Sequence, residues 1–312
     1  MDTLRAITYF ARALELGSLS AVAREAGTTQ PTISKALAGL ERQLGVRLLE
    51  RSTTSLVATV PGQRFYGRAR RLLEEYTEAV ADARGQTGQP AGLLRVHAAV
   101  AFGQLRLNGL VQRFLDQHPA IQIELILDDR YVDLVEDGVD VALRLGDGSG
   151  LPPDAVARLL ATSSRTLVAA PAYLARRADL PLAVPADLAG HDYLRYAWLA
   201  SGDLLTLWSA TARAEVRTHG RFRVNHALAI RDTLLLGGGV GLCPAWLVHD
   251  LVAEGRLKSV LPDWHGVPQQ LHLLLPSRHY PSVRARLFAD FISAEVPRLP
   301  GFAAATAPPP PA

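Results

Sequence analysis

The chain has 312 residues, which is enough for about two domains of roughly 150 residues each. Its hydrophobic residues make up 48% and its charged residues 20%, a composition that supplies a buried core and argues against general disorder. The net charge is only +3, and the single cysteine, Cys243, excludes a disulfide within the chain and argues against a zinc site built from cysteines.

Positive charge is concentrated at the start of the chain. Residues 1–71 contain eleven Lys or Arg and five Asp or Glu, a balance of +6, whereas the other residues contain 22 and 25, a balance of −3. Such asymmetry is typical of a region that meets a polyanion, so we expect this quarter of the chain to do so.

The sequence contains neither the pattern of a secretory signal nor that of a membrane span. The chain begins without the basic-then-apolar run of a secretory signal. Its longest stretch free of Asp, Glu, Lys and Arg, residues 233–249, contains three consecutive glycines and Pro244, which a membrane span would not. We predict a cytoplasmic protein that has no membrane partner.

The first region is predicted to consist of short helices that end at glycines. Apolar residues from Leu4 to Leu14 recur at helical spacing, and Gly17 then stops the helix. A second helix is predicted over residues 21–26, with Ser20 as its N-cap. A short helix, a tight turn and a longer helix together form a helix-turn-helix.

The third helix carries the predicted DNA-contacting face. Thr29 is its predicted N-cap, and Pro31 falls in the first turn, where its missing N–H costs nothing. Apolar residues at 33, 36, 37, 40 and 44 form one stripe, and short or polar side chains that suit base edges and phosphates lie opposite, namely Gln30, Pro31, Thr32, Ser34, Lys35 and Ala38. The alternative is the solvated face of an ordinary helical bundle.

A small hairpin is predicted after this helix. Residues 46–49 and 56–59 flank a polar segment, as in the wing of a winged helix-turn-helix. Arg51 is the best phosphate-binding candidate there, although a lone arginine is often only a surface residue.

A long amphipathic helix is predicted from Pro61 to about Arg84. At 1.5 Å per residue, its 24 or so residues would span about 36 Å. Its apolar residues alternate spacings of four and three, as in a coiled coil, at Phe65, Ala69, Leu72, Tyr76, Ala79 and Ala83. We predict that this stripe pairs with a second copy, which would match a palindromic DNA site; the alternative is packing against its own chain.

A glycine-rich linker, residues 85–92, precedes a region of alternating strands and helices. This alternation is typical of an α/β fold with a mostly parallel sheet. Strands are expected over 93–99, 121–127, 139–144, 165–169, 220–224, 240–243 and 270–275, and helices over 103–117, 131–136, 172–177, 226–236, 245–253 and 282–296. The low-complexity end, 299–312, is predicted to be a disordered tail.

Several segments together resemble the LysR-type transcriptional regulators. They include GSLSAVA at 17–23, QPTIS at 30–34, LLER at 48–51, DVALRLG at 140–146 and APAYL at 170–174. The resemblance implies an α/β fold class: an N-terminal winged helix-turn-helix over 1–60, a dimerising linker helix and hinge over 61–91, and a two-lobed, periplasmic-binding-protein-like α/β effector domain over 92–298. Lobe I would comprise 92–161 and 268–298, and lobe II 162–267, with crossings near Ala161 and Val267.

The resemblance also implies that a small-molecule effector binds in the cleft between the lobes. The candidate effector-binding residues are Ala99, Val100, Phe102, Arg144, Gly146, Trp198 and Asn225. Arg144 could pair with a carboxylate or form an internal salt bridge, and Asn225 could instead cap the helix that starts at 226. Residues 98–101 lack a side-chain hydroxyl, so backbone N–H groups at the following helix start would bind the effector there.

The first hypothesis is therefore a DNA-binding transcriptional regulator with no catalytic residue, metal or cofactor. Its partners would be double-stranded operator DNA and a small-molecule effector, and the resemblance implies a homodimer that assembles into a homotetramer, with RNA polymerase as a further candidate partner. The alternative is a solute-binding protein or an enzyme whose N-terminal region only oligomerises. Against an enzyme, the glycine run at 237–241 lacks the Lys-Ser/Thr of a phosphate-binding loop, and Cys243 fits a buried small hydrophobe.

Overall fold

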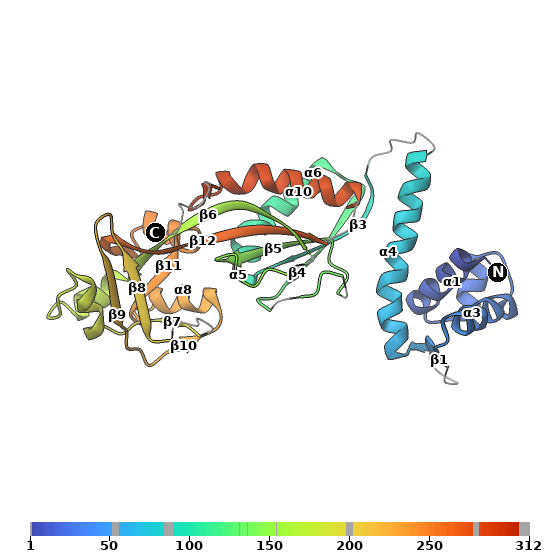
Figure 1. Ribbon diagram of the computed structural model, residues 1–312, viewed down its shortest axis with the longest axis horizontal. Helices are drawn as coiled ribbons and strands as arrows, with labels where there is room; N and C mark the ends of the chain where they lie inside the picture. The colour runs from blue at the N-terminus through green and yellow to red at the C-terminus, as the bar shows by residue number, and fades with distance from the viewer. Residues whose placement is uncertain are drawn as a thin grey trace. The chain divides into compact units, whose positions relative to one another are not determined.

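The structure, a computed structural model, describes residues 2–51, 56–83, 90–130, 132–135, 137–153, 155–197, 202–276 and 281–305. The chain divides into two compact units (Figure 1). The N-terminal unit comprises Met1–Pro90 with Val132–Val139, and the C-terminal unit comprises Ala91–Tyr131 with Asp140–Ala312.

The N-terminal unit contains the predicted helix-turn-helix, the wing and the long helix. Strands β1 and β2 pair antiparallel, with Leu49 opposite Ala58, which confirms the hairpin. The elements are α1 (Thr3–Leu16), α2 (Leu19–Glu25), α3 (Gln30–Leu44), β1 (Leu49–Arg51), β2 (Leu56–Ala58) and α4 (Val60–Ala83).

Local capping explains where these helices begin. The side chain of Thr29 accepts a hydrogen bond from the backbone N–H of Thr32 at 3.4 Å, so the predicted cap of α3 is confirmed. The predicted cap of α2 is wrong: Ser18, not Ser20, accepts from the N–H of Ala21. The helix starts earlier because Leu19 is buried in the core and is held there as its first residue.

The stripe of α4 is divided between two environments. Phe65 and Ala69 pack against the core of their own unit, as the alternative interpretation had it, and Leu73 joins them there. Leu72 and Tyr76, however, are 46% and 53% exposed. The predicted pairing with a second copy therefore remains a prediction for the latter part of the stripe, and the side chains of Ala79 and Ala83 lie outside the described ones.

The C-terminal unit is built on a mixed sheet whose main path runs β11-β6-β12-β5-β3-β4. Strand β3 is parallel to β4 and β5, whereas β12 is antiparallel to both β5 and β6, and β11 is antiparallel to β6. The expectation of a mostly parallel sheet is wrong because two long strands traverse the unit. The strands are β3 (Gly92–Ala98), β4 (Ile121–Leu127), β5 (Val141–Gly146), β6 (Ala155–Ala169), β11 (Val240–Pro244) and β12 (Lys258–Pro276).

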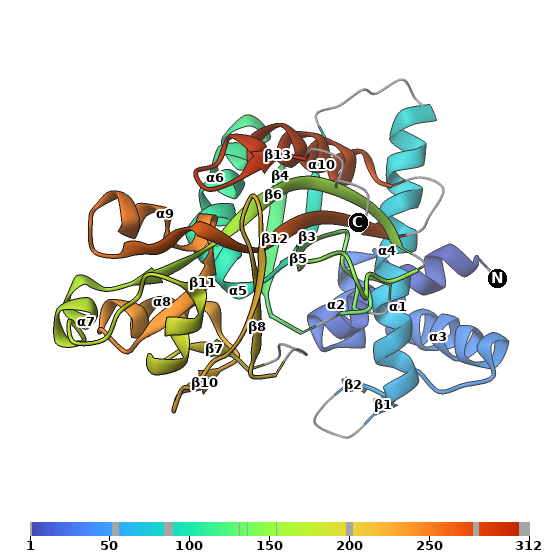
Figure 2. The same cartoon turned by 60° about the vertical axis from the view of Figure 1, so that its left-hand side comes forward.

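Strands β6 and β12 connect two groups of elements (Figures 1 and 2). Near one end β12 pairs with β5, and near the other β6 pairs with β11. We call the group beside β5 the first half; it contains β3–β5, α5 (Val100–Phe102), the π-helical turn η1 (Gly103–Leu107), α6 (Asn108–Gln117) and α10 (Val283–Glu295). The second half contains β11, α7 (Pro171–Arg176), α8 (Ala227–Leu235), α9 (Ala245–Ala253) and strands β7 to β10.

Four short strands of the second half complete the sheets. β8 (Leu204–Trp208) and β9 (Arg213–Arg217) form a hairpin that the sequence did not indicate, and β7 (Arg195–Tyr196) is parallel to β10 (Arg223–Val224). The positions of the predicted crossings, Ala161 and Val267, lie inside β6 and β12.

Two further expectations differ from the structure. Residues 132–135, in the region of the helix predicted over 131–136, are not helical, and only Leu134 and Val135 lie in a turn. The prediction of a disordered tail from residue 299 is wrong for 299–305, because β13 (Ala303–Ala304) pairs with β6 and Phe302 packs on the core. The remainder of that tail lies outside the described residues.

Candidate nucleic-acid interface and ligand-binding site

The exposed face of α3 is the candidate nucleic-acid interface. Its inner face, Ile33, Leu37 and Leu40, is fully buried against α1 and α2. The opposite face presents Gln30, Pro31, Thr32, Lys35 and Ala38 to solvent, with Ser34 half-buried. The packing of one face thus fixes which side chains the other face offers.

Hydrogen bonds at the start of α3 orient its first turn. The hydroxyl groups of Thr29 and Thr32 lie 2.9 Å apart, and the hydroxyl of Ser20 on α2 donates to Gln30 Oε1 at 3.3 Å. Helix N-termini carry free N–H groups and partial positive charge, which favour phosphate contacts. Gln30 and Thr32 are therefore held where the helix can approach a DNA strand.

Ion pairs neutralise some of the cationic side chains of the N-terminal unit and leave others available to contact a phosphate. Arg12 on α1 pairs with Glu15 and Glu25, and these carboxylates raise the pKa of its guanidinium. Lys35, by contrast, is exposed and has no hydrogen bond or ion pair within the part of the chain that the structure describes. Lys35 can therefore offer its full charge to a phosphate.

The wing is anchored from its base. Glu41 Oε1 on α3 accepts hydrogen bonds from the N–H groups of Leu48 at 2.7 Å and Leu49 at 3.1 Å, which tie β1 to α3. The backbone of Arg51 ends β1, but its side chain and residues 52–55 lie outside what the structure describes. The phosphate contact of Arg51 stays a prediction.

The first predicted effector contacts lie where β3 ends and α5 begins. Ala99 is the residue before α5 and is half-buried. The N–H of Val100, which we expected to be open to an effector, donates to Asp129 Oδ1 at 3.1 Å. Phe102 is fully buried among the rings of Trp246 and Phe302, so it is wrong as an effector contact.

Arg144 is placed inside the sheet rather than on an open surface. It lies on β5 opposite His272 of β12 and is 7% exposed. Burial also lowers the pKa of His272, since a cationic imidazole is poorly solvated there. Gly146 ends β5, and the loop after it packs closely enough that a Cβ on Gly148 would lie 3.4 Å from His272. Pairing of Arg144 with a carboxylate stays a prediction.

The structure bears on only one of the last two candidates. Asn225 is exposed, and α8 starts at Ala227 with His226 at its N-cap position, so the alternative of Asn225 as the cap is wrong. Trp198 lies outside the described residues.

Two residues that the sequence did not single out, Asp129 and Tyr196, belong to the region of the predicted effector contacts, since Asp129 accepts a hydrogen bond from Val100. Tyr196, at the end of β7, packs half-buried against the same core as Ala99 and Leu228 of α8. Burial, and then the negative charge of Asp129, raise the pKa of Tyr196 to about 12. Tyr196 from the second half thus lies near Asp129 from the first. The sequence did contain a signal for Asp129. This residue comes just after the strand predicted over 121–127, and ligand-binding residues of α/β sheets gather at strand ends.

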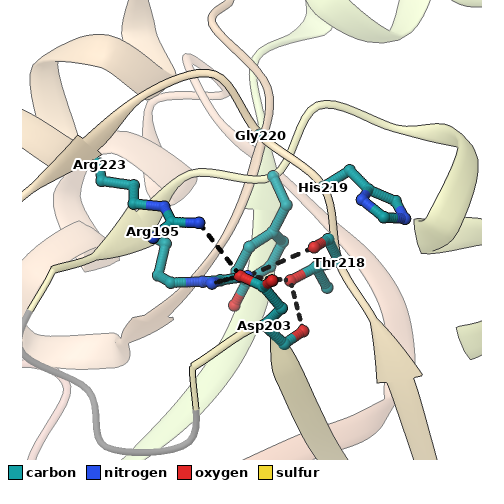
Figure 3. Close-up of a pocket in the computed structure, with 7 residues that line it drawn as sticks. Arg195, Asp203, Thr218, His219, Gly220 and Arg223 are labelled. Carbon is teal, nitrogen blue, oxygen red and sulfur yellow. Dashed lines mark hydrogen bonds and ion pairs between the residues drawn. The ribbon is translucent and has the colours of Figure 1, made fainter.

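In a polar pocket of the second half, the charged side chains that line it are paired with one another. Figure 3 shows Arg195 paired with Asp203 and donating to the hydroxyl of Thr218 at 2.9 Å. Arg223 approaches the same carboxylate at 3.3 Å, and Arg195 holds the pKa of Asp203 below its usual value. The carboxylate occupies the place that an external anion would take, so the pocket stabilises the β8–β9 hairpin.

Other chemistries find little support among the described residues. Cys243 is buried, which raises the pKa of its thiol to about 12 and disfavours the thiolate that a nucleophile needs. Within the described ranges, no cluster of three His, Cys, Asp or Glu residues is placed to hold a metal ion. Nor does any described helix combine the length and apolarity needed to cross a membrane.

Comparison with known proteins identifies the family. A family model described as the LysR substrate binding domain matches residues 87–297, and one for bacterial regulatory helix-turn-helix proteins of the lysR family matches residues 4–63. The chain belongs to the LysR family of transcriptional regulators. The predicted resemblance, the fold class and the function of a LysR-type regulator with an effector-binding domain are thereby confirmed.

Several relatives of this LysR-type regulator match over nearly its whole length. It is 34% identical over 298 residues to the HTH-type transcriptional regulator PtxR of Pseudomonas aeruginosa, covering 93% of this chain and 92% of that protein. It is 30% identical over 294 residues to the HTH-type transcriptional regulator CrgA of Neisseria meningitidis, with 93% and 96% covered. The solved structure of CrgA is similar with a TM-score of 0.60 at 28% identity, covering 94% of this chain and 98% of that one. These relatives are regulators and not enzymes.

Proposed function

We propose that this LysR-type regulator binds operator DNA through the exposed face of α3, with Gln30, Pro31, Thr32, Ser34 and Lys35 at the major groove and Arg51 at a phosphate. The observation that carries the proposal is the division of α3 into a fully buried apolar face and an exposed polar face that includes Lys35, which has no ion pair among the described residues. A regulator with this activity works where the DNA is, in the cytoplasm, without a cofactor.

A gel-shift titration on DNA from immediately upstream of the protein's own gene tests this proposal. At about 0.15 M salt, where non-specific phosphate binding is weakened, we expect a discrete shift that resists an unrelated competitor. No selective shift there, or on the neighbouring intergenic regions with pools of small molecules added, would favour the solute-binding or enzymatic alternative.

The role of Lys35 has a matched control in the same chain, because Lys258 is the only other lysine. Lys35→Ala should weaken DNA binding. It should also reduce the steepness of the fall of log K, the logarithm of the binding constant, with log salt by about one. Lys258→Ala, on the exposed start of β12 in the C-terminal unit, should leave that slope unchanged. Equal slopes for both variants would remove Lys35 from the phosphate contacts.

For the effector, we propose a site at the strand ends and helix starts of the C-terminal unit. The first half would contribute Ala99, Val100, Asp129, Arg144 and Gly146, and the second half would contribute Tyr196 and Asn225. A thermal-shift screen of small metabolites would supply candidates. Stabilisation by a true effector should fall in Tyr196→Ala and persist in Trp208→Ala, which alters an exposed residue of β8. Equal stabilisation of both variants would exclude Tyr196 from the site.

We also propose that α4 pairs with a second copy through Leu72 and Tyr76, giving a homodimer that assembles into a homotetramer and can contact RNA polymerase. The exposure of these two large apolar side chains supports the pairing. Tyr76→Asp should lower the sedimentation coefficient of the protein, and Thr77→Asp, at the adjacent exposed position, serves as its control. An unchanged coefficient in Tyr76→Asp would place the dimer contact elsewhere.

A further inference from the structure

The segment after α10 crosses from the first half of the C-terminal unit to the second. Helix α10 belongs to the first half, yet residues 299–305 extend to Trp246 in the first turn of α9, which belongs to the second half. After that contact, Ala303 and Ala304 pair with Thr162 and Ala161 of β6. These positions lie in the middle of β6, where that strand passes between the halves.

Three aromatic rings meet at this place, each from a different part of the unit. The ring of Phe302 stacks on that of Trp246 with centroids 6.1 Å apart and planes 8° apart. It also meets the ring of Phe102 edge-on at 6.0 Å, and Phe102 in turn meets Trp246 at 5.9 Å. Phe302 thus contacts one ring from each half at the same time.

Hydrogen bonds hold the segment in register. The hydroxyl of Ser163 on β6 donates to the carbonyl of Gly301 at 2.7 Å and accepts from the N–H of Trp246 at 3.2 Å. Gly301 has a φ of +80°, and a Cβ there would overlap the backbone of Trp246. Glycine is therefore required for the close approach that presents Phe302 to Trp246.

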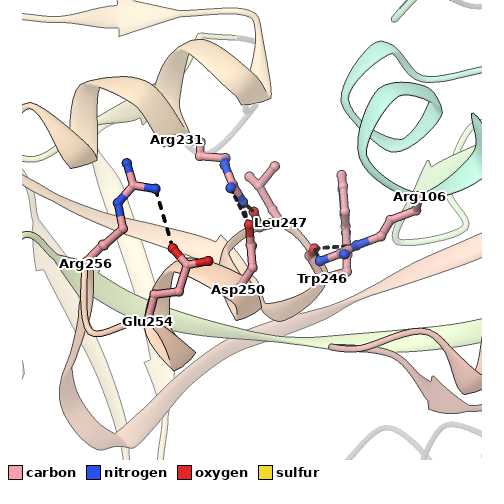
Figure 4. Close-up of polar contacts among 7 residues, drawn as sticks. All are labelled: Arg106, Arg231, Trp246, Leu247, Asp250, Glu254 and Arg256. Atoms are coloured by element: carbon pink, nitrogen blue, oxygen red, sulfur yellow. Dashed lines mark hydrogen bonds and ion pairs between the residues drawn. The ribbon is translucent and has the colours of Figure 1, made fainter. Parts of the chain in front are cut away.

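A direct polar contact between the halves lies beside these rings. Figure 4 shows Arg106 of the π-helical turn η1 donating to the carbonyl of Trp246, at 2.7 Å from Nη2 and 3.2 Å from Nε. Helix α9, which carries Trp246, is itself bound to α8. Arg231 of α8 pairs with Asp250 of α9 at 2.5 Å and donates to the carbonyl of Leu247 near the start of α9. A force on Trp246 would therefore be transmitted to α8 and α9 together.

We propose that residues 299–305 act as a latch that holds the two halves of the C-terminal unit in one relative position, with Phe302 as its tip. Any movement of α9 relative to α5 must part Phe302 from either Trp246 or Phe102, because the ring touches both. The latch sets how readily the halves can shift. That this controls the response to an effector rests on the proposed function; the latch itself does not.

The latch can be tested by measuring a distance between the halves in the full-length protein, without effector or DNA. Spin labels at Gln112→Cys on α6 and Ala175→Cys on α7, both exposed positions, report that distance by pulsed electron–electron double resonance. The native Cys243 is 1% exposed and stays unlabelled. Dilution with unlabelled protein removes distances between subunits.

Phe302→Ala is the test substitution, and Phe291→Ala is its matched control. Phe291 is another half-buried phenylalanine, on α10, but its aromatic contact is Phe114 of the first half. We expect Phe302→Ala to shift or broaden the distance distribution, and Phe291→Ala to reproduce the parent distribution. The milder Phe302→Leu, which keeps apolar volume but loses ring stacking, should broaden the distance distribution to an intermediate extent. If Phe302→Ala does not fold, Phe302→Leu serves as the test of the latch.

An unchanged distribution in the folded Phe302 variants would overturn the latch, as would equal broadening in Phe291→Ala. Because no DNA or effector is present, either result is independent of the gel-shift test. A failed gel shift would overturn the proposed DNA interface and leave the latch standing.

Discussion

Replacing Phe10 by alanine should destabilise the N-terminal unit selectively. Phe10 lies on α1, is fully buried, and contacts two rings on α4: Phe65 at 5.5 Å and Tyr66 at 6.5 Å. Its side chain therefore joins the helix-turn-helix to the long helix, and its removal leaves a cavity where the two pack together.

The cost can be estimated from the burial of the ring. A fully buried Phe→Ala substitution destabilises by about 3–5 kcal/mol, a figure that includes the lost aromatic contacts. At roughly 0.05–0.15 kcal/mol per residue, a unit of about 90 residues has a free energy of unfolding of about 4–13 kcal/mol. The substitution should thus remove a large part of the stability of this unit and, with it, the DNA binding.

The chain provides two probes that distinguish the units. All four tryptophans lie after residue 190, so tryptophan fluorescence reports the C-terminal unit alone. Circular dichroism at 222 nm also reports the helices of the N-terminal unit. In urea, Phe10→Ala should bring an early loss of ellipticity and leave the fluorescence transition in place.

The control is Phe288→Ala on α10, which is fully buried in the C-terminal unit and should shift the fluorescence transition instead. If Phe10→Ala moved both transitions together, the two units would unfold as one and the reasoning would fail. If it moved neither, the contact between α1 and α4 would not be what stabilises the unit.

Three other outcomes are expected. Arg231 lowers the pKa of Asp250 to about 2, so this pair adds stability above pH 4 that is lost as the pH falls towards 2. Because the carboxylate is 40% exposed and solvent screens the pair, we expect this contribution to be only about 1 kcal/mol. In urea titrations, Asp250→Asn should be less stable than the parent at pH 7 and approach it only near pH 2; a pH-independent difference would contradict the assignment. Cys243, whose thiol has its pKa raised to about 12, should resist iodoacetamide at pH 8 until urea unfolds the chain, as mass spectrometry would show; alkylation of the folded protein would refute its burial. Gly62→Ala should destabilise the N-terminal unit by roughly 1–3 kcal/mol, since a Cβ would overlap the carbonyl of Leu48, and an unchanged ellipticity midpoint in urea would count against that contact.

The elements of the N-terminal unit could be predicted because their signals are local. The apolar stripe of α3, its cap Thr29 and its terminal Gly45 lie within 17 residues of one another. The one wrong cap, Ser20 in place of Ser18, arose because both serines can cap a helix and only the burial of Leu19 chooses between them. Packing, rather than capping chemistry, set that boundary.

The candidate effector site was predictable only in part. Ala99 and Gly146 follow strands, and the structure places them at strand ends as expected. Phe102 follows the same strand but points into the core, and the sequence does not show which way a helical side chain faces before its partners are known. Tyr196 was missed because its neighbour Asp129 lies more than 60 residues earlier in the chain.

The family, the helix-turn-helix with its wing, and the exposed polar face of α3 could all be predicted from the sequence, since periodicity and capping act between neighbouring residues. The antiparallel course of β6 and β12 through both halves and the packing of Phe302 between Phe102 and Trp246 became evident only in the folded structure. Those contacts join residues far apart in the sequence, 56 positions for Phe302 with Trp246 and 110 for Leu271 with Ala161, and the pairing of such distant segments depends on the folding of everything between them.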